Sequence, residues 1–307
     1  MNSLTPSFSP DCLASLWNEL DRQSFPEGAL YVVATPIGNV GDISLRAIRV
    51  LSLADAIACE DKRNTGQLMA RLGLSKPLFS AHQHNERETA QKIIERLHAG
   101  ARIALVSDAG TPAVSDPGAR IVDAVIGAGL KVIPVAGPSA AIAALSVSGL
   151  LSEQFYFVGF MPAKSSQREQ LLSGLVSSTA NLVFYEAPHR IIEAAQSLLT
   201  ILGPERRIVI AREISKLFEQ VHRCRLAEAP DWLSAEANHQ RGEFVLVVEG
   251  QSAANEQPLS DARHVLQTLL EELPVSQAAA LAAKITGMKK NTLYQLALEL
   301  RPQDLAD

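Results

Sequence analysis

Two short sequences contain residue types that could together bind a ligand. They are Ser-Asp-Ala-Gly-Thr-Pro at 107–112 and Asp-Pro-Gly at 116–118. They follow the apolar segment 103–106, which has the composition of a buried strand. Small residues that end a strand and lead into a helix leave backbone N–H and C=O groups open to a bound molecule. We therefore predict a ligand site at this strand end, the usual binding edge of an open α/β sheet.

Short apolar segments of the first half are predicted to be strands, and helical sequence separates them. The segments are 30–34, 56–59, 77–80, 102–107 and 131–135. Crossovers of this length favour a parallel, doubly wound sheet. The loops that follow the strands, at 35–39, 60–66, 82–86, 108–112 and 136–140, then all lie on one edge of that sheet. Their shared position is the physical argument for a site there.

The second half of the chain predicts a second α/β domain with a mixed sheet and then a helical end. Its strand-like segments are 155–160, 182–185, 207–211, 221–226 and 244–248. From Pro258 onward only helices are predicted, over 262–273, 276–286 and 291–300. We therefore divide the chain into an N-terminal tail with one short helix near 13–20 (1–28), a first α/β domain (29–149), a second α/β domain (150–252) and a small helical appendage (258–302).

The composition excludes several classes of protein. The formal net charge of −5 gives no overall signal for nucleic acid, so an RNA partner would need a local basic patch. No apolar stretch approaches the roughly 18 residues that span a bilayer, and the acidic residues near the N-terminus argue against a signal peptide. The cysteines lack metal-ligand spacing and fit reduced thiols in the cytoplasm, and no metal is expected. Without G-x-G-x-x-G after the first strand or a P-loop lysine, a Rossmann dinucleotide site and a nucleoside triphosphatase are disfavoured.

Several motifs occur in an order that resembles a known family. They are Thr-Pro-Ile-Gly-Asn at 35–39, the sequences at 107–112 and 116–118, Phe-Tyr-Glu-Ala-Pro-His-Arg at 184–190, Arg212 with Glu213, Lys216, and the segments 241–243 and 287–291. From Leu30 to about Leu300 the chain resembles the tetrapyrrole-methylase-like superfamily of S-adenosylmethionine-dependent methyltransferases. Within that superfamily it is most similar to the family that methylates small-subunit ribosomal RNA.

The resemblance implies an enzyme that transfers a methyl group from S-adenosyl-L-methionine to the ribose 2′-oxygen of a cytidine in 16S ribosomal RNA. It also implies that the cofactor binds in the cleft between two α/β domains, that the protein is a homodimer, and that no membrane is involved. By position, the residues expected at the cofactor are Pro36, Ile37, Gly38, Asp108, Ala109, Gly110, Ala113, Ser139, Ala140, Tyr185, Glu186 and Gly242.

A ribose hydroxyl is a weak nucleophile at neutral pH, so a nearby base would assist the transfer. The candidates are Asp61, Glu213 and Lys216, which all lie at predicted strand ends or in loops. Lys216 could act as a base only if burial lowered its pKa, and otherwise it suits a phosphate contact. Spacing alone does not choose among the three. Relatives usually have Thr and His where this chain has Lys62 and Asn64, so no base is assigned at those positions.

Binding of RNA requires Lys and Arg side chains that neutralise phosphates. The residues expected to do so are Arg63, Arg190, Arg212, Lys284, Lys289 and Lys290. The three lysines lie in and between terminal helices that resemble a small helix-turn-helix, and a solvated helix face is the alternative explanation for them. Two other functions stay open, which are methylation of a tetrapyrrole precursor on the same fold and a nucleotide-binding module without catalysis.

Overall fold

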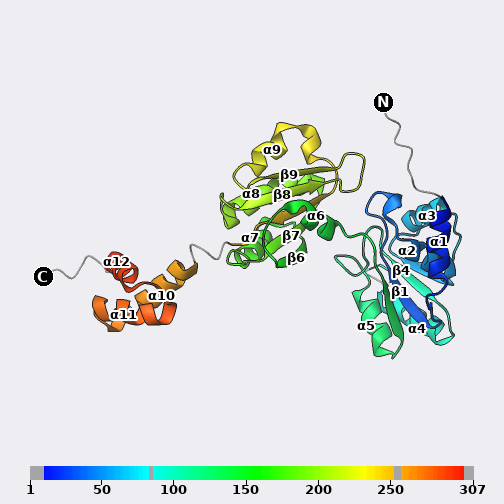
Figure 1. Cartoon of the computed structure of the whole chain (residues 1–307), viewed down its shortest axis with the longest axis horizontal. Helices are drawn as coiled ribbons and strands as arrows, with labels where there is room; N and C mark the ends of the chain where they lie inside the picture. The colour runs from blue at the N-terminus through cyan, green and yellow to red at the C-terminus, as the bar shows by residue number, and fades with distance from the viewer. Residues whose placement is uncertain (1–9, 83–85, 252–256, 301–307) are drawn as a thin grey trace.

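The structure, a computed structural model, describes residues 10–82, 86–251 and 257–300 (Figure 1). The first half forms a five-stranded sheet of order β3-β2-β4-β1-β5, and its strand pairs are parallel. The strands are β1 (Ala29–Val33), β2 (Ala56–Cys59), β3 (Leu78–Ser80), β4 (Ile103–Val106) and β5 (Lys131–Val135). The predicted parallel sheet is confirmed. Of the predicted loop 82–86, residues 83–85 lie outside the described part.

Helices cover both faces of this sheet because alternate strand residues point to opposite sides. The elements are η1 (Val40–Asp42), α2 (Leu45–Leu53), α3 (Lys62–Arg71), α4 (Glu86–His98) and α5 (Ala119–Gly127). Tyr31 of β1 packs in a core with α2 and α3, whereas its neighbour Leu30 packs in a second core with α4 and α5. The sheet is therefore doubly wound, and the carboxyl ends of its strands form one open edge.

The segment before the first strand is anchored rather than free. Helix α1 (Pro10–Leu20) is longer than the predicted helix, and it lies against α2. Leu20 is buried, the Arg49 guanidinium lies 5.7 Å from the centre of the Trp17 ring, and Arg49 also forms a 2.5 Å ion pair with Asp21. The predicted N-terminal tail thus has a described part, from residue 10, that packs on the first domain.

The second sheet has the order β6-β7-β10-β8-β9. Its strands are β6 (Phe155–Phe160), β7 (Asn181–Glu186), β8 (Arg207–Arg212), β9 (Gln220–Arg225) and β10 (Phe244–Val248). The β6–β7 pair is parallel and the other pairs are antiparallel, so the predicted mixed sheet is confirmed.

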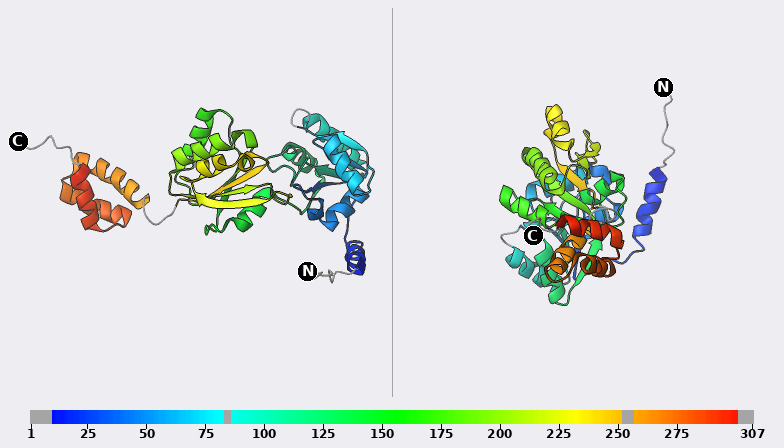
Figure 2. Two further views of the ribbon diagram at one scale, coloured as in Figure 1. Left: turned by 90° about the horizontal axis from the view of Figure 1, so that it is seen from above. Right: turned by 90° about the vertical axis from the view of Figure 1, so that its left-hand side faces the viewer.

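Two helical layers enclose the second sheet, with α6 (Ala140–Ser148) on one face (Figure 2). The elements of the other layer are α7 (Ser165–Ser173), η2 (Pro188–Arg190), α8 (Ile191–Leu202), α9 (Ala229–Ala235) and η3 (Ala237–Gln240). The sequence did not predict the short helix α9. It is anchored by Trp232, whose ring stacks between His222 and His239 at centroid distances of 4.1 and 3.9 Å.

Helix α6 belongs by its packing to the second sheet. Ala141, Ala144 and Ser148 are buried at helical spacing, and the two alanines form a core with Val183 and Val245 of that sheet. Small side chains allow the helix to approach the sheet closely. The predicted boundary after residue 149 assigns this helix to the first domain, whereas the structure packs it on the second. The other predicted domain limits stay predictions.

The C-terminal helices α10 (Gln257–Glu272), α11 (Val275–Thr286) and α12 (Lys290–Leu300) form a core of their own. Gly287 ends α11 in a left-handed conformation, with φ of 71°. Residues 301–302 of the predicted appendage lie outside the described part. No helix in the described ranges combines the length and the apolar character that a membrane span needs.

Candidate functional site

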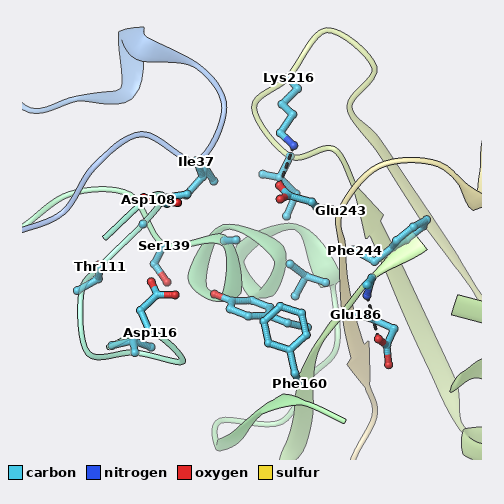
Figure 3. A pocket seen from close by; sticks show the side chains of 18 of the residues that line it. Ile37, Asp108, Thr111, Asp116, Ser139, Phe160, Glu186, Lys216, Glu243 and Phe244 are labelled. Atoms are coloured by element: carbon cyan, nitrogen blue, oxygen red, sulfur yellow. Dashed lines mark hydrogen bonds and ion pairs between the residues drawn. The ribbon is translucent and has the colours of Figure 1, made fainter. Parts of the chain in front are cut away.

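A cleft with a volume of about 430 Å³ lies between the carboxyl edge of the first sheet and the second sheet (Figure 3). From the first half of the chain it is lined by Ile37, Glu60, Asp108, Ala109, Gly110, Thr111, Val114, Asp116, Ser139 and Ala140. From the second half it is lined by Phe160, Tyr185, Glu186, Ala187, Pro188, Ile214, Lys216, Glu243, Phe244 and Val245. We call these two sets the first wall and the second wall.

The first wall is fixed by hydrogen bonds between the loops after β1 and β4. Thr35 and Gly110 exchange two backbone hydrogen bonds, of 2.8 and 3.0 Å, and the Thr35 hydroxyl donates to the Ser107 carbonyl at 3.1 Å. Gly110 has a φ of 79°, a conformation that favours glycine. The hydroxyl of Thr111 donates to the Pro138 carbonyl at 3.2 Å and ties in the loop after β5. The loops predicted to share an edge are therefore joined there.

Carboxylates give the first wall its charge. Asp108 accepts hydrogen bonds from the Asp61 backbone N–H at 3.1 Å and from the Asn64 side chain at 2.7 Å. Burial and the nearby charges of Asp108 and Asp116 raise the pKa of Glu60. Burial also raises the pKa of Asp116, and Asp108 adds to this effect. The three acids make this end of the cleft electronegative, which favours a cationic ligand.

The second wall is mainly aromatic and apolar. The Tyr185 ring contacts the rings of Phe157 and Phe160 edge to face, at centroid distances of 5.0 and 5.6 Å. The Tyr185 hydroxyl accepts a hydrogen bond from the backbone N–H of Ala141 at 3.2 Å, which joins α6 to this wall. Phe160 is 57% exposed and provides a ring that a flat ligand could contact.

A lysine of the second wall lies at one end of the cleft, where Figure 3 shows it opposite Ile37. The ammonium of Lys216 donates to Glu213 and to Glu243, both at 2.8 Å. Burial acts to lower its pKa, but these two carboxylates outweigh burial and raise it. Lys216 is therefore a cation at neutral pH. For Glu213, burial raises the pKa, while the hydrogen bonds from Lys216 and the Glu243 backbone outweigh burial and lower it.

Two glycines leave the space that this ion pair occupies. A Cβ atom on Gly38 would lie 2.4 Å from Cγ of Lys216, and a Cβ on Gly242 would lie 2.4 Å from Cγ of Glu213. Gly38 belongs to the first domain and Gly242 to the second, so each domain contributes one glycine against which the ion pair packs.

Eight of the twelve residues predicted at the cofactor line the cleft; they are Ile37, Asp108, Ala109, Gly110, Ser139, Ala140, Tyr185 and Glu186. Pro36 and Ala113 lie in the same loops beside lining residues, and Gly38 and Gly242 accommodate the ion pair. Asp116, Glu60, Glu243 and Phe244 also line the cleft, and they lie in or beside motifs and loops that the sequence places at the site. Phe160 was missed, although it ends the predicted strand 155–160.

The predicted bases have different surroundings. The carboxylate of Asp61 caps α3 by accepting from the Arg63 backbone N–H at 2.6 Å, and Asp61 does not line the cleft. Glu213 is covered by Lys216 and does not line the cleft. Among the three candidates only Lys216 does.

The residues predicted to contact RNA fall into two groups, one with partners inside the protein and one exposed to solvent. Arg190 is held by Glu186 at 3.1 Å and by the Met161 carbonyl, and Arg212, only 9% exposed, donates to the Arg241 carbonyl at 3.0 Å. These two arginines serve internal contacts instead of facing solvent. The other predicted contacts, Arg63, Lys284, Lys289 and Lys290, are exposed. No cluster of His, Cys, Asp or Glu in the described residues could hold a metal ion.

S-Adenosylmethionine fits the residues present. Its sulfonium and ammonium groups are cationic and suit the carboxylates of the first wall, whereas the aromatic second wall suits the flat adenine ring. The cleft volume of about 430 Å³ lies in the range of small-molecule sites.

Comparison with protein families gives two matches along the chain. The model of the family "Tetrapyrrole (Corrin/Porphyrin) Methylases" matches residues 29–230, and that of the "RsmI C-terminal HTH domain" matches residues 256–301. Among solved structures, the methyltransferase CobJ matches with a TM-score of 0.56 at 19% identity, covering 73% of this chain and 94% of that chain. A uroporphyrin-III C-methyltransferase from Thermus thermophilus, complexed with S-adenosylhomocysteine, matches with a TM-score of 0.51 at 19% identity, covering 72% of this chain and 97% of that one.

The fold and the cleft define a methyltransferase of the tetrapyrrole methylase class, whose cofactor is S-adenosylmethionine. Curated relatives specify the family further. The ribosomal RNA small subunit methyltransferase I of Vibrio cholerae is 48% identical over 91% of this chain and 98% of its own length, and that of Pseudomonas aeruginosa is 48% identical over 89% and 97%. The chain belongs to the ribosomal RNA small subunit methyltransferase I family.

Proposed function

We propose that the protein transfers the methyl group of S-adenosylmethionine to the ribose 2′-oxygen of a cytidine in 16S ribosomal RNA. The observation that carries the proposal is the cleft with one acidic wall and one aromatic wall, in a chain that is 48% identical to named ribosomal RNA methyltransferases over nearly its whole length. A uroporphyrin-III C-methyltransferase from Thermus thermophilus is 22% identical to this chain and the methyltransferase CobJ is 19% identical, so these two relatives support the fold alone.

The cofactor supplies an electrophilic methyl group, and the chain must bring the accepting oxygen into line with it. Backbone at Ala109 and Gly110, fixed by the bonds between Thr35 and Gly110, forms the floor of the first wall. Phe160 and Tyr185 cover the other side and exclude water. Lys216, Glu213 and Glu243 fix one end of the second wall, and the Lys216 side chain packs there against Gly38 of the first domain.

A proton must leave the ribose hydroxyl during the transfer. The surroundings of each acidic side chain near the cleft indicate which of them could accept this proton. Lys216 is protonated and suits a phosphate or the developing negative charge on oxygen, while Asp61 and Glu213 already accept other hydrogen bonds. Glu60 and Asp116 line the cleft with raised pKa values, so they bind a proton more readily than ordinary carboxylates. These two are the acceptors that we favour.

Contact with the RNA outside the cleft is assigned to exposed cations of α3 and the C-terminal helices. Lys284 of α11, Lys289 of the following turn and Lys290 of α12 are exposed in a segment that matches a helix-turn-helix family model. Arg63 is exposed beside the first wall. Replacing the three lysines by glutamine should weaken subunit binding in proportion to the phosphates lost. The slope of log K against log salt should fall by about 0.7 for each lost contact to single-stranded RNA. An unchanged slope would refute this role.

The homodimer is assigned to a surface of α6 and the following strand. Large apolar side chains exposed there include Ile142, Val147, Leu151 and Phe155, with Leu151 86% exposed. Exposed apolar groups of this size favour a protein interface. Sedimentation of the wild type and of an Ile142→Glu/Leu151→Glu variant tests the dimer, which should dissociate in the variant.

The enzyme acts in the cytoplasm, as expected for a protein whose substrate is ribosomal RNA.

The deciding experiment is transfer of tritiated methyl from S-adenosylmethionine to small ribosomal subunits that lack the modification. Precursor tetrapyrroles serve as the competing substrate. Label that survives alkaline hydrolysis of the RNA as a protected dinucleotide supports the proposal. Label in the tetrapyrrole, or in neither substrate, would overturn it.

A further inference from the structure

The loop between β8 and β9 exposes two adjacent large apolar side chains to solvent. Leu217 is 90% exposed and Phe218 is 68% exposed. In Figure 1 this loop extends from the end of the β8–β9 pair toward the first domain. A single exposed apolar residue needs no explanation, whereas two neighbours at the edge of a functional cleft indicate a contact with another molecule.

Hydrogen bonds hold the loop in one conformation, so the side chains of Leu217 and Phe218 stay exposed to solvent instead of packing against the protein. The Ser215 N–H donates to the Glu219 carboxylate at 2.6 Å, and the Ser215 hydroxyl donates to Asp42 of the first domain. Glu213 and Ser215 have positive φ values, of 52° and 67°, which non-glycine residues rarely adopt. Such strain is characteristic of functional loops.

The same loop lines the cleft immediately before the apolar pair. Ile214 and Lys216 are lining residues, and Lys216 is fixed by Glu213 and Glu243. Because consecutive Cα atoms lie about 3.8 Å apart, the backbone of Phe218 is within about 8 Å of Lys216, a residue that lines the cleft. A nucleotide whose ribose enters the cleft therefore has its neighbouring base beside this pair.

We infer that Leu217 and Phe218 form an apolar platform that stacks on a nucleobase next to the ribose to be methylated. The inference rests on the proposed function. A ribose inside duplex or stacked RNA cannot reach an enclosed cleft, so the target nucleotide must leave its stack and its neighbour loses a stacking partner. Aromatic side chains replace that partner in single-stranded RNA recognition, and apolar side chains can wedge between bases. Lys216, in the same loop, is placed to accompany the adjoining phosphate.

The test compares Phe218→Ala with Phe218→Trp and with a matched control, Ile126→Ala. Ile126 is an apolar residue of α5 that is 59% exposed and does not line the cleft. Stacking on one base is lost in Phe218→Ala, so its KM for the small subunit should rise about 10-fold. Phe218→Trp should retain the wild-type KM because it preserves the stacking surface. Affinity for S-adenosylhomocysteine should stay unchanged in all three variants.

A fluorescent RNA provides a second readout. In an RNA carrying 2-aminopurine beside the target cytidine, wild type should quench the fluorescence of the unstacked base by stacking on it, whereas Phe218→Ala should leave it bright. A wild-type KM and normal quenching in Phe218→Ala would overturn the inference. Dissociation of the dimer in that variant, with an unchanged KM per active site, would assign the pair to a second copy of the chain and also overturn it. Absence of RNA methylation by the wild type would instead refute the proposed function itself.

Discussion

The two walls of the cleft differ in the chemical groups that they offer to a ligand. The first wall consists of loops whose backbones are bonded to one another, as at Thr35 and Gly110, and it carries three carboxylates. The second wall consists of side chains from strands and their ends, with the rings of Phe160 and Tyr185 in contact. One wall therefore provides charge and exposed backbone, and the other provides apolar area.

This difference indicates which part of the cofactor each wall recognises. Carboxylates attract the cationic sulfonium and amino groups, and this attraction is weakened by salt. Ring contacts depend on buried area and change little with salt. Substitutions in the two walls should therefore separate by the size of their effects and by their salt dependence.

The largest effect is expected for Asp108→Asn in the first wall. Asp108 accepts from both the Asp61 N–H and the Asn64 side chain, and an amide would place a donor against one of these donors. Losing charge-assisted hydrogen bonds of this kind costs about 1.5–3 kcal/mol, so affinity for S-adenosylmethionine should fall on the order of 10- to 100-fold. Isothermal titration calorimetry measures the affinity of the variant and of the wild type for S-adenosylmethionine. Asp123→Asn, on the exposed side of α5, is the control.

The outcome of that titration bears directly on the comparison. The affinity lost in Asp108→Asn should shrink as ionic strength increases, because the wild type loses its electrostatic advantage. An equal affinity in the variant and the wild type at low salt would show that the first wall does not act through charge.

A smaller effect is expected where the two walls meet, in Gly38→Ala. The added Cβ would lie 2.4 Å from Lys216, so the lysine and its ion pairs must move. Overpacking of this kind costs about 1–3 kcal/mol, and kcat/KM for the small subunit should fall on the order of 10-fold. Gly127→Ala is a matched control, because a Cβ there meets nothing within 4 Å. Full activity of Gly38→Ala would mean that the position of Lys216 is unimportant.

The sequence predicted the fold well because its signals are local. Apolar segments bounded by turn residues placed β5 and β10 at their observed bounds, and the crossovers gave the parallel sheet. The affiliation of α6 with the second sheet was not predictable in this way. It depends on which sheet the small residues of that helix contact, and this contact is determined by the tertiary arrangement of the chain and not by local sequence. The last helix was predicted to begin at residue 291, whereas α12 begins one residue earlier, at Lys290.

The site was predicted to a lesser extent, and its errors have a common cause. Spacing located the loops of the first wall, but it could not show that Asp61 turns its carboxylate toward the start of α3 while Glu60 lines the cleft. Likewise, the sequence could not show that Arg190 and Arg212 have partners inside the protein. Side-chain direction is decided by tertiary contacts, which no motif records.

In the second wall, Phe160→Ala should have a moderate effect. The change removes one ring from the contact with Tyr185 and opens the cleft to water. Aromatic contacts contribute about 0.5–1.5 kcal/mol beyond buried area, so affinity for S-adenosylhomocysteine should fall about 5-fold, equally at low and high salt. Phe160→Leu, which keeps apolar bulk, should lose less. A loss that vanished at high salt would contradict the assignment of this wall to apolar contact.

The smallest effect concerns stability rather than binding. Burial and the charges of Asp108 and Asp116 raise the pKa of Glu60 above its ordinary value of 4.5. The folded state therefore binds this proton more tightly than the unfolded state, and stability is lost as pH rises through the raised pKa. Glu60→Gln removes that loss, so at about pH 8 its Tm should exceed that of the wild type by about 1–2 °C. Near about pH 4, where the wild-type carboxyl is largely protonated, the difference should disappear. A Tm difference that is constant with pH would mean that the three acids of the first wall do not repel one another.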